Sequence, residues 1–409
     1  MKTIFTKRSP LPREQGQSGR RGTAIILAVV MMFVVLGIAA FTVDYGLLNV
    51  TKGQMQNAAD SAAHAAMQEL IQGIGPGATM NSQVASSNAG NRAETIVQRF
   101  RTGDVNSTSL AVDRDVRFGR RSWNSTTNRW VQEWGTTPYN MVEVTVRRTK
   151  AVDAPLGAVF SRVFGHDFFD LEAKAVASVA PVTGFSLPTG GSSGSESDYD
   201  STINILPIAL DLTTWNSLLA QIYHGTANGF QDQHRFNENS GTVSSGSDGI
   251  LEVNIYPDAN STLPPGNRGT VDLGSPNNST NDLKRQIEFG LNAYDLSFFP
   301  NNEIKFNSAG TLELNGDTGI SAGIESSLKA IIGHVSAIPI FISVSGPGNN
   351  AQYTIVKFVG VRVMAVKLTG GPTMRYLRVQ PAPYSTRFAI RGNVPVTLDS
   401  VFSQPLLIQ

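Results

Sequence analysis

One uncharged apolar run near the start of the chain constrains its fold more than any other feature. The run extends from Thr23 to Val43, is 21 residues long and reads TAIILAVVMMFVVLGIAAFTV. As a helix it would span about 32 Å, which matches the hydrocarbon core of a bilayer. A helix also satisfies its own backbone hydrogen bonds, as lipid requires. The sequence therefore predicts a transmembrane helix over residues 23–43.

The charges on the two sides of this run predict its orientation. Residues 1–22 contain six basic residues and one acidic residue, a balance of +5, and the remaining 387 residues contain 27 basic and 31 acidic residues, a balance of −4. The positive-inside rule places residues 1–22 in the cytoplasm as a basic head and residues 44–409 outside. The run is isolated, which excludes a multi-span transporter.

A cleaved secretory signal is the alternative interpretation of the run. Such a signal has a shorter apolar region and a cleavage site between small residues, for which Gly37 to Ala40 is a candidate. The full length of the run favours a retained, single-pass anchor over a signal. The anchor residues that we expect to face the lipid bilayer are Thr23, Val29, Phe33, Leu36, Phe41 and Val43.

The helical pattern continues beyond the apolar run. In residues 44–72 the apolar residues, many of them alanines, recur at helical spacing on one face, and polar residues lie beside them. This pattern indicates an amphipathic helix outside the membrane. The glycine-rich segment Gly73 to Gly77 predicts the end of this helix. We therefore expect one continuous helix of about 50 residues, half of it in lipid and half packed on the exported part of the chain.

The order of residues along this helix resembles the N-terminal module of TadG-like proteins, the TadE/TadG-like components of Flp (tight-adherence) pilus assembly. The resemblance covers residues 20–70: Arg20-Arg21-Gly22, the apolar helix, Val43 to Gly46, and the stretch from Gln56 to Ala63. Looser similarity extends to Ala180. The family-motif residues are Asp44, Gln56, Asn57, Ala58, Ala59, Asp60, Ala62 and Ala63.

This resemblance implies a non-enzymatic protein of the bacterial inner membrane, with its C-terminal part in the periplasm or facing the envelope, that helps to assemble adhesive pili. The sequence departs from the family at two places. Relatives processed like prepilins carry Glu at the fifth position after the cleavage-site glycine, and Leu27 stands there after Gly22. Some TadG proteins carry a von Willebrand A domain with an Asp-x-Ser-x-Ser metal motif, which Asp198 to Thr202 does not match.

The exported part reads as α+β. We expect a small α+β unit over residues 73–182 with a helix at 86–100 and strands that include 141–148 and 171–180. A Gly/Ser-rich linker is expected over residues 183–202. Residues 203–409 predict a mixed, β-rich C-terminal domain, in which residues 355–368, apolar on both faces, form a central strand next to residues 338–344.

Motifs of known catalytic chemistry are missing from the sequence. The chain has no cysteine, which excludes disulfides, thiolate zinc sites and cysteine nucleophiles, and the net charge of +1 argues against a nucleic-acid partner. His224 and His234 are expected in a polar loop without a third metal ligand. The loops at Asp248-Gly249 and Asn315 to Gly319 are expected to be turns and not calcium sites.

Three tryptophans, Trp123, Trp130 and Trp134, leave a sugar-binding patch open, although packing within a hairpin is favoured. No cofactor and no small-molecule substrate is expected. The first hypothesis is a structural envelope protein that docks pilus or secretion-machinery partners through the apolar face of its external helix and sheet, which includes Ala59 and Ala62. The second places the function in residues 203–409, as a membrane-tethered module that binds carbohydrate or calcium, or as a hydrolase.

Overall fold

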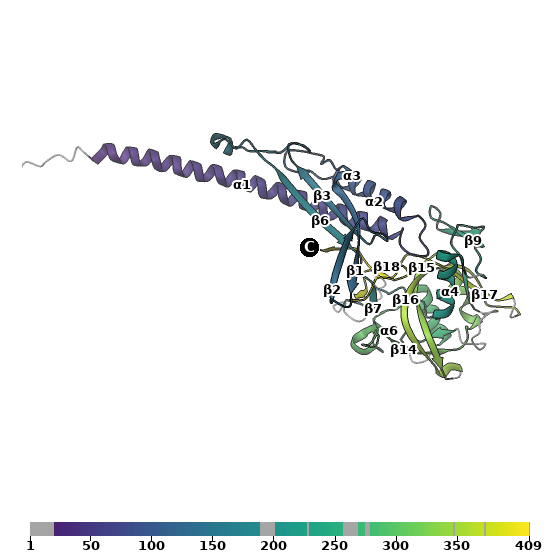
Figure 1. Ribbon diagram of the computed structural model, residues 1–409. Coiled ribbons are helices and arrows are strands. Elements are labelled where there is room, and N and C mark those ends of the chain that lie inside the picture. Colours follow the sequence, from purple (N-terminus) through teal and green to yellow (C-terminus); the bar gives the residue numbers. More distant parts are fainter. Residues whose placement is uncertain are drawn as a thin grey trace, which may run out of the picture.

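A single helix of 52 residues, α1 (Arg20–Ile71), projects from one side of the protein in the computed structural model (Figure 1). The structure describes residues 20–188, 201–226, 229–256, 269–274, 279–346, 348–371 and 374–408, with the side chains of residues 20–23 and 349 left aside. The helix continues without a break from the apolar run into the amphipathic segment, as the sequence predicts. Its N-terminal half extends away from the body, and its C-terminal half is packed into it.

The first core lies between α1, a second helix and a five-stranded antiparallel sheet. Helix α2 (Ser82–Val97) is capped by Asn81, whose side chain accepts a hydrogen bond from the N–H of Val84. The sheet has the order β2-β1-β3-β6-β21. Its strands are β1 (Val116–Asn124), β2 (Arg129–Trp134), β3 (Met141–Arg148), β6 (Leu171–Ser178) and β21 (Leu406–Ile408), and the four-residue helix α3 (Val112–Asp115) precedes β1.

The strands β3 and β6 are predicted correctly because their apolar residues alternate. Val142, Val144 and Val146 are fully buried in the same cluster as alternate residues of β6. The predicted helix at 86–100 exists but starts four residues earlier, at Ser82, where Asn81 provides the cap. The α+β class with an N-terminal membrane helix is thus confirmed.

The second part of the chain is built around strand β16 (Ala351–Lys367), which has 17 residues. It pairs with β14 (Leu312–Asp317), β15 (Val335–Ser345) and β17 (Tyr376–Pro381), all antiparallel. The other strands of this seven-stranded sheet are β8 (Leu210–Asp211), β11 (Val253–Tyr256) and β12 (Thr270–Val271). The prediction of a central strand that pairs with residues 338–344 is confirmed.

Two apolar clusters lie against β16. Helices α4 (Leu212–His224), α5 (Thr280–Phe289) and α7 (Glu325–Ala330) pack with Val359, Val361 and Val363. Phe358 and Tyr353 join the other cluster, together with Phe185 and Ile304. Each face of strand β16 is thus covered by one cluster, which accounts for the apolar residues on both of its faces.

Smaller elements complete the fold. They are β4 (Leu156–Gly157), η1 (Ser161–Phe164), β5 (Phe168–Phe169), β7 (Val182–Ser186), β9 (His234–Asn237), β10 (Thr242–Ser245), α6 (Ala293–Leu296), η3 (Pro300–Asn302), β13 (Glu303–Lys305), η4 (Ala322–Ile324), η5 (Gly348–Asn350), β18 (Ser385–Thr386), β19 (Ala389–Arg391) and β20 (Phe402–Ser403).

The chain crosses between the two parts more often than the sequence suggests. The prediction of a linker over 183–202 is wrong at its start, where β7 pairs with β13 and β19 and Phe185 is fully buried. Residues 189–200 lie outside the described residues. Near the other end of the chain, Phe402 joins the core of the first part and β21 pairs with β6. The domain boundaries at 182 and 203 remain predictions.

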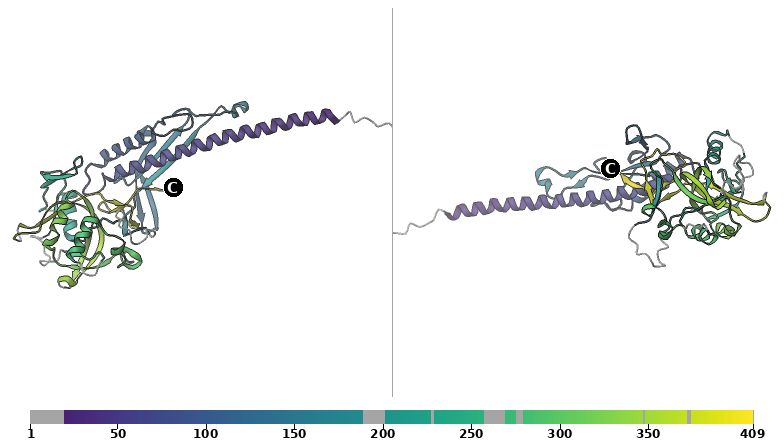
Figure 2. Two further views of the ribbon diagram at one scale, coloured as in Figure 1. Left: turned by 180° about the vertical axis from the view of Figure 1, so that it is seen from behind. Right: turned by 90° about the horizontal axis from the view of Figure 1, so that it is seen from below.

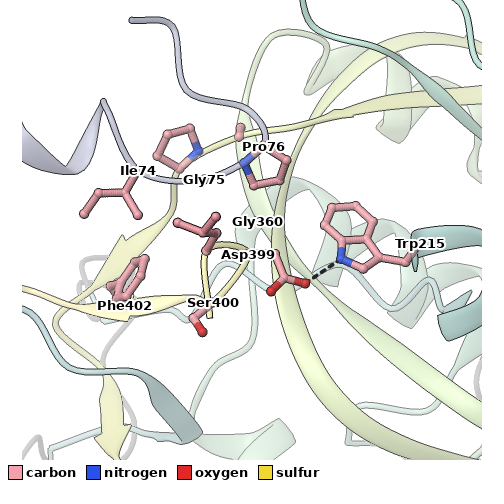
Figure 3. A pocket seen from close by; sticks show the side chains of 11 residues that line it. Ile74, Gly75, Pro76, Trp215, Gly360, Asp399, Ser400 and Phe402 are labelled. Carbon is pink, nitrogen blue, oxygen red and sulfur yellow. Dashed lines mark hydrogen bonds between the residues drawn. The ribbon is translucent and has the colours of Figure 1, made fainter. Parts of the chain in front are cut away.

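The end of α1 rests directly on the second part. Gly77 approaches Pro381 so closely that an added Cβ would lie 1.9 Å from the Pro381 carbonyl oxygen. Ile74, Gly75 and Pro76 line a small void with Leu398, Asp399 and Trp215 (Figure 3). The void holds about 10 Å³, so this junction is packed and leaves no room for a ligand.

Candidate functional site: helix α1 and the elements packed on it

The apolar half of α1 has no protein partner. Among the described residues, one helix is long and apolar enough to cross a membrane, and its most apolar window is 0% buried. Four predicted anchor side chains, those of Phe33, Leu36, Phe41 and Val43, are at least half exposed, and that of Val29 is 43% exposed. The side chain of Thr23 lies outside the described residues. This distribution fits a helix that lipid covers.

The alanine stripe of the family motif is used inside the chain. Ala58, Ala59, Ala62 and Ala63 are all 0% exposed and belong to the first core with residues of α2, β3 and β6. Small side chains allow the helix axis to come close to its neighbours. The stripe therefore joins α1 to its own α2 and sheet, and is not open for a partner as the first hypothesis expected.

The polar motif residues fix the register of α1 on the sheet. The Gln56 Nε2 atom donates to the carboxylate of Asp60 at 2.8 Å and to the backbone carbonyl of Lys174, in β6, at 3.0 Å. Two residues before Gln56, the side chain of Gln54 accepts a hydrogen bond from the N–H of Gly103 at 2.7 Å. Asn57, in contrast, faces solvent.

Asp44 has the most extensive set of hydrogen bonds in the motif. Its carboxylate accepts hydrogen bonds from the backbone N–H groups of Val159, Phe160 and Ser161 and from the Ser161 hydroxyl, with the closest N–H at 2.6 Å. The Ser161 hydroxyl makes the largest contribution to lowering the pKa of Asp44, to about 2, and the three N–H groups add to it against the effect of burial. Asp44 thus holds the loop after β4 against helix α1, at the point where the apolar run ends.

A buried arginine supports the loops beside the motif helix. The Arg148 side chain is 0% exposed; it donates to the carbonyl oxygens of Thr102 and Ala154 and pairs with Asp104 at 2.9 Å. Asp115, also buried, pairs with Arg114 and Arg147. Burial raises the pKa of Asp115, but the hydrogen bonds from both arginines and from the Ala111 N–H outweigh it and lower the pKa. The sequence does not indicate these residues, since the partners Thr102 and Asp104 of Arg148, and Arg147 of Asp115, are distant in sequence.

The predicted tryptophan hairpin exists. Trp123 and Trp130 face each other across β1 and β2 with ring centroids 5.5 Å apart. The guanidinium of Arg121 lies 4.4 Å from the ring centre of Trp130, and that of Arg117 lies 4.7 Å from that of Trp134. The rings are half-buried against one another and against arginines.

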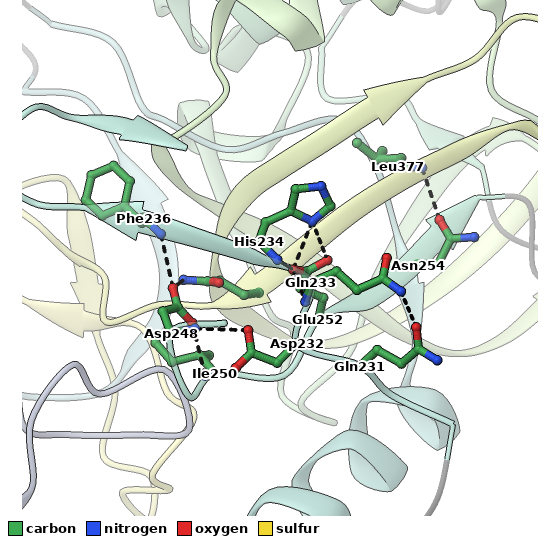
Figure 4. A network of polar contacts seen from close by, with 11 residues as sticks. Gln231, Asp232, Gln233, His234, Phe236, Asp248, Ile250, Glu252, Asn254 and Leu377 are labelled. Carbon is green, nitrogen blue, oxygen red and sulfur yellow. Dashed lines mark hydrogen bonds and ion pairs between the residues drawn. The ribbon is translucent and has the colours of Figure 1, made fainter. Parts of the chain in front are cut away.

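The acidic loops of the second part bind their own backbone. Asp232 accepts from the N–H groups of Asp248 and Gly249, and Asp248 accepts from Phe236 (Figure 4). Across the described residues, no group of three or more His, Asp or Glu side chains could hold a metal ion. The Asp248-Gly249 turn is as predicted, whereas Asn315 to Asp317 belong to strand β14 and do not form a turn.

His224 and His234 do not share one loop as predicted. His224 ends helix α4, whereas His234 begins β9 and its Nδ1 atom lies 3.0 Å from the Glu252 carboxylate (Figure 4). This pair has no nucleophile or third acidic partner among its described contacts. The pair therefore connects the start of β9 to Glu252, the residue before β11, and does not form a catalytic group.

One hollow in the second part could hold a small ligand. It measures about 240 Å³ and is lined by Arg362, Gln380, Asp248, Glu238 and Phe236 among others. Within the described part of the chain, Arg362 Nε and Gln380 Oε1 are buried without a hydrogen-bond partner. The Arg362 guanidinium also stacks on Phe236 at 3.5 Å.

Comparison with known proteins adds one finding. Searches of curated proteins and of solved structures gave no match. Residues 22–69 match the family model described as Flp pilus-assembly TadE/G-like, and this range contains the apolar run, Asp44 and the whole Gln56–Ala63 motif. Helix α1, from its apolar half to the motif packed in the first core, is therefore the part of this protein that is similar to the TadE/G-like pilus-assembly family.

Proposed function

We propose that this protein is a non-enzymatic, single-pass component of Flp/Tad-type pilus assembly or surface adhesion. Its basic head lies in the cytoplasm, α1 spans the bacterial inner membrane, and residues 44–409 lie in the periplasm or face the envelope. The single observation that supports this proposal best is the continuity of α1. One rigid helix has its apolar half uncovered and its family-motif half fixed in the core of the exported part.

We further propose that partners dock on the outward side of α1 and on the adjoining sheet. Because the alanine stripe is buried by α2 and β6, the exposed residues of α1 from Lys52 onward are polar or small, such as Lys52, Asn57 and Ser61. Partners would be pilus or secretion-machinery proteins that pack a helix or a strand edge on this surface.

Site-specific photocrosslinking in cells tests this docking surface. A photoreactive residue in place of Asn57 is expected to crosslink to other Tad-type proteins, and one in place of Asn239, in the exposed β9–β10 turn, is not. Crosslinks at both positions to the same proteins, or at neither, would count against the proposed surface. The crosslinked partners would be identified by mass spectrometry.

A second candidate function is ligand binding in the hollow lined by Arg362 and Gln380. The two unpartnered buried polar atoms, Arg362 Nε and Gln380 Oε1, favour it, since they could bind an acceptor and a donor on a ligand. Thermal unfolding of the full chain with a carbohydrate panel and with calcium tests this candidate. A rise in Tm that the Arg362→Met variant lacks would support binding, and an unchanged Tm throughout would contradict it for these ligands.

A further inference from the structure

The loop between β4 and β5 exposes an unusual concentration of apolar side chains. The two short strands pair with Leu156 opposite Phe169, and the 3₁₀ turn η1 between them ends at Gly165 in the left-handed conformation, with φ of 83°. We call residues 158–169 the hairpin tip. Its exposed apolar residues are Val159, Phe160, Val163, Phe164 and Phe168, with 53%, 42%, 84%, 72% and 53% of each residue accessible.

Contacts at three successive positions along the axis of α1 fix where the hairpin tip lies. Gln56 bonds to Lys174 in β6, and an added Cβ on Gly103 would contact both Thr51 and Leu156. Asp44 bonds to residues 159–161. The hairpin therefore runs along α1 toward the membrane half of the helix, as the teal loop beside α1 shows in both Figure 1 and Figure 2.

Asp44 marks the height at which the bilayer begins. It directly follows Val43, the last residue of the uncharged run, so a bilayer filled by residues 23–43 has its polar boundary beside Asp44. The N–H groups of Val159 to Ser161 lie within hydrogen-bond distance of that carboxylate, 2.6 to 3.2 Å away. The apolar tip is thus held at the headgroup level of the membrane that α1 crosses.

We propose that the hairpin tip inserts into the interfacial layer of this same bilayer as a second membrane contact. Phenylalanine and valine side chains partition into this layer. The exposed Arg162 between them can extend its guanidinium to lipid phosphates. Phe41 and Tyr45, which lie on α1 within one helix turn of Asp44, are also exposed and stack on each other, so the tip is docked beside further apolar surface of the anchor. This position indicates lipid as the occupant that covers the tip. The proposal rests on anchorage of the chain in a bilayer and not on a role in pilus assembly.

Two points of contact would fix the orientation of the exported part. A single helix leaves a protein free to rotate and tilt about its anchor, whereas a helix and a loop held together by Asp44 define a plane. The hairpin lies between β3 and β6 in the chain, so the sheet of the first part would be held by it. The exported part would then keep one face toward the membrane. The loop would act as a brace that sets this face.

Lipid-based quenching of a fluorophore tests the proposal on the full chain. The protein has no cysteine, so Val163→Cys, labelled with an environment-sensitive fluorophore, reports from the tip alone. The labelled chain is reconstituted into phosphatidylcholine vesicles with and without spin-labelled lipids. Leu36→Cys is the control for the span, and Val84→Cys, an exposed valine at the start of α2, is the control for the distant ectodomain.

We expect the label at position 163 to lose fluorescence with headgroup-proximal spin-labelled lipid, and the label at position 84 to lose none. Quenching at position 36 shows in every sample that α1 is inserted. A label at 163 that responds only to aqueous iodide would overturn the proposal. A label that neither quencher reaches would overturn it as well, since protein would then cover the tip. The variant Val163→Asp with Phe164→Asp is expected to abolish lipid quenching of a label at Phe168→Cys while α1 stays inserted.

Discussion

The carboxylate of Asp44 accepts hydrogen bonds from both the hydroxyl and the N–H of Ser161, although the two residues are 117 positions apart in the chain. Asp44 is the first residue after the apolar run, and Ser161 begins the 3₁₀ turn of the hairpin tip. This contact links the membrane anchor to the sheet independently of the alanine core. It explains why an acidic residue is placed so close to the expected edge of a bilayer.

Removal of the Asp44 side chain is predicted to release the hairpin tip. In Asp44→Ala the N–H groups of Val159, Phe160 and Ser161 lose their acceptor, so their amide exchange is expected to become about tenfold faster or more. Hydrogen exchange of the full chain in detergent, read by mass spectrometry on the peptide that contains these residues, measures the change. The matched control is Asp113→Asn, which alters an exposed carboxylate in the same part of the fold. Equal exchange in the wild type and Asp44→Ala would contradict this prediction.

Acid is predicted to detach the hairpin tip within a defined range of pH. Hydrogen bonds from Ser161 and from the backbone N–H groups lower the pKa of Asp44 from its ordinary value of 3.8 to about 2, so docking favours the ionised carboxylate. The stabilising contribution is complete above about pH 4 and decreases as the pH falls toward 2, where the carboxylate is protonated. Spin labels on Val163→Cys and Val50→Cys report the distance between tip and helix. We expect the distance distribution to broaden only below about pH 4, and broadening that is complete at higher pH would contradict the assignment to Asp44.

A charge in the alanine stripe is predicted to unfold the first core. Ala62 is fully buried between α1, α2 and the sheet, so Ala62→Asp places a carboxylate without a partner in an apolar site. The expected loss is about 3 kcal/mol or more in the free energy of unfolding. Ser61→Asp, on the exposed side of the same helix turn, is expected to change stability by no more than about 0.5 kcal/mol. Near-UV circular dichroism during denaturation measures both, and equal stability of the two variants would place the stripe outside the core.

Arg148 is predicted to stabilise the loops on either side of β3. Arg148→Ala removes the donors to the Thr102 and Ala154 carbonyl oxygens and the ion pair with Asp104, at an expected loss of about 2 to 3 kcal/mol. Arg129→Ala, an exposed arginine at the start of β2, is the control and is expected to have little effect. The same denaturation measurement, together with proteolysis after Arg101, distinguishes the two. An Arg148→Ala variant as stable as the control would show that the buried guanidinium is dispensable.

Elements whose pattern is local could be predicted from the sequence. The apolar run and the spacing of alanines predict α1, and the alternation of valines in β3 predicts its inner face. The continuous apolar stretch in β16 predicts a strand covered on both faces. In each case the pattern that predicts the element lies within one helix or one strand, although distant elements provide the burial.

Contacts that join distant parts of the chain carry no comparable signal. The partners of Asp44 are mainly backbone N–H groups, which every residue except proline has, so no side-chain pattern indicates residues 159–161. Strand β21 is three residues long and finds its place by pairing with β6. Strand β7 lies inside a segment whose Gly and Ser content predicts a linker, since a single buried Phe185 decides its position. The alanine stripe was predicted as an apolar face, but the sequence does not show that α2 and β6 already cover it.

The proposed function and the proposed membrane contact of the hairpin tip both require α1 to cross the membrane with residues 44–409 outside, and cysteine accessibility measures this orientation directly. Because the chain has no cysteine, Ser9→Cys and Thr127→Cys introduce single thiols before the span and at the β1–β2 turn. Cells whose outer barrier has been opened are treated with a membrane-impermeant maleimide, and the full-length protein is recovered from the inner-membrane fraction. We predict that position 127 is labelled while the inner membrane is intact. Position 9 is predicted to be labelled only after the inner membrane is lysed. Labelling of both positions before lysis, or recovery of a shortened soluble chain, would contradict the anchored arrangement.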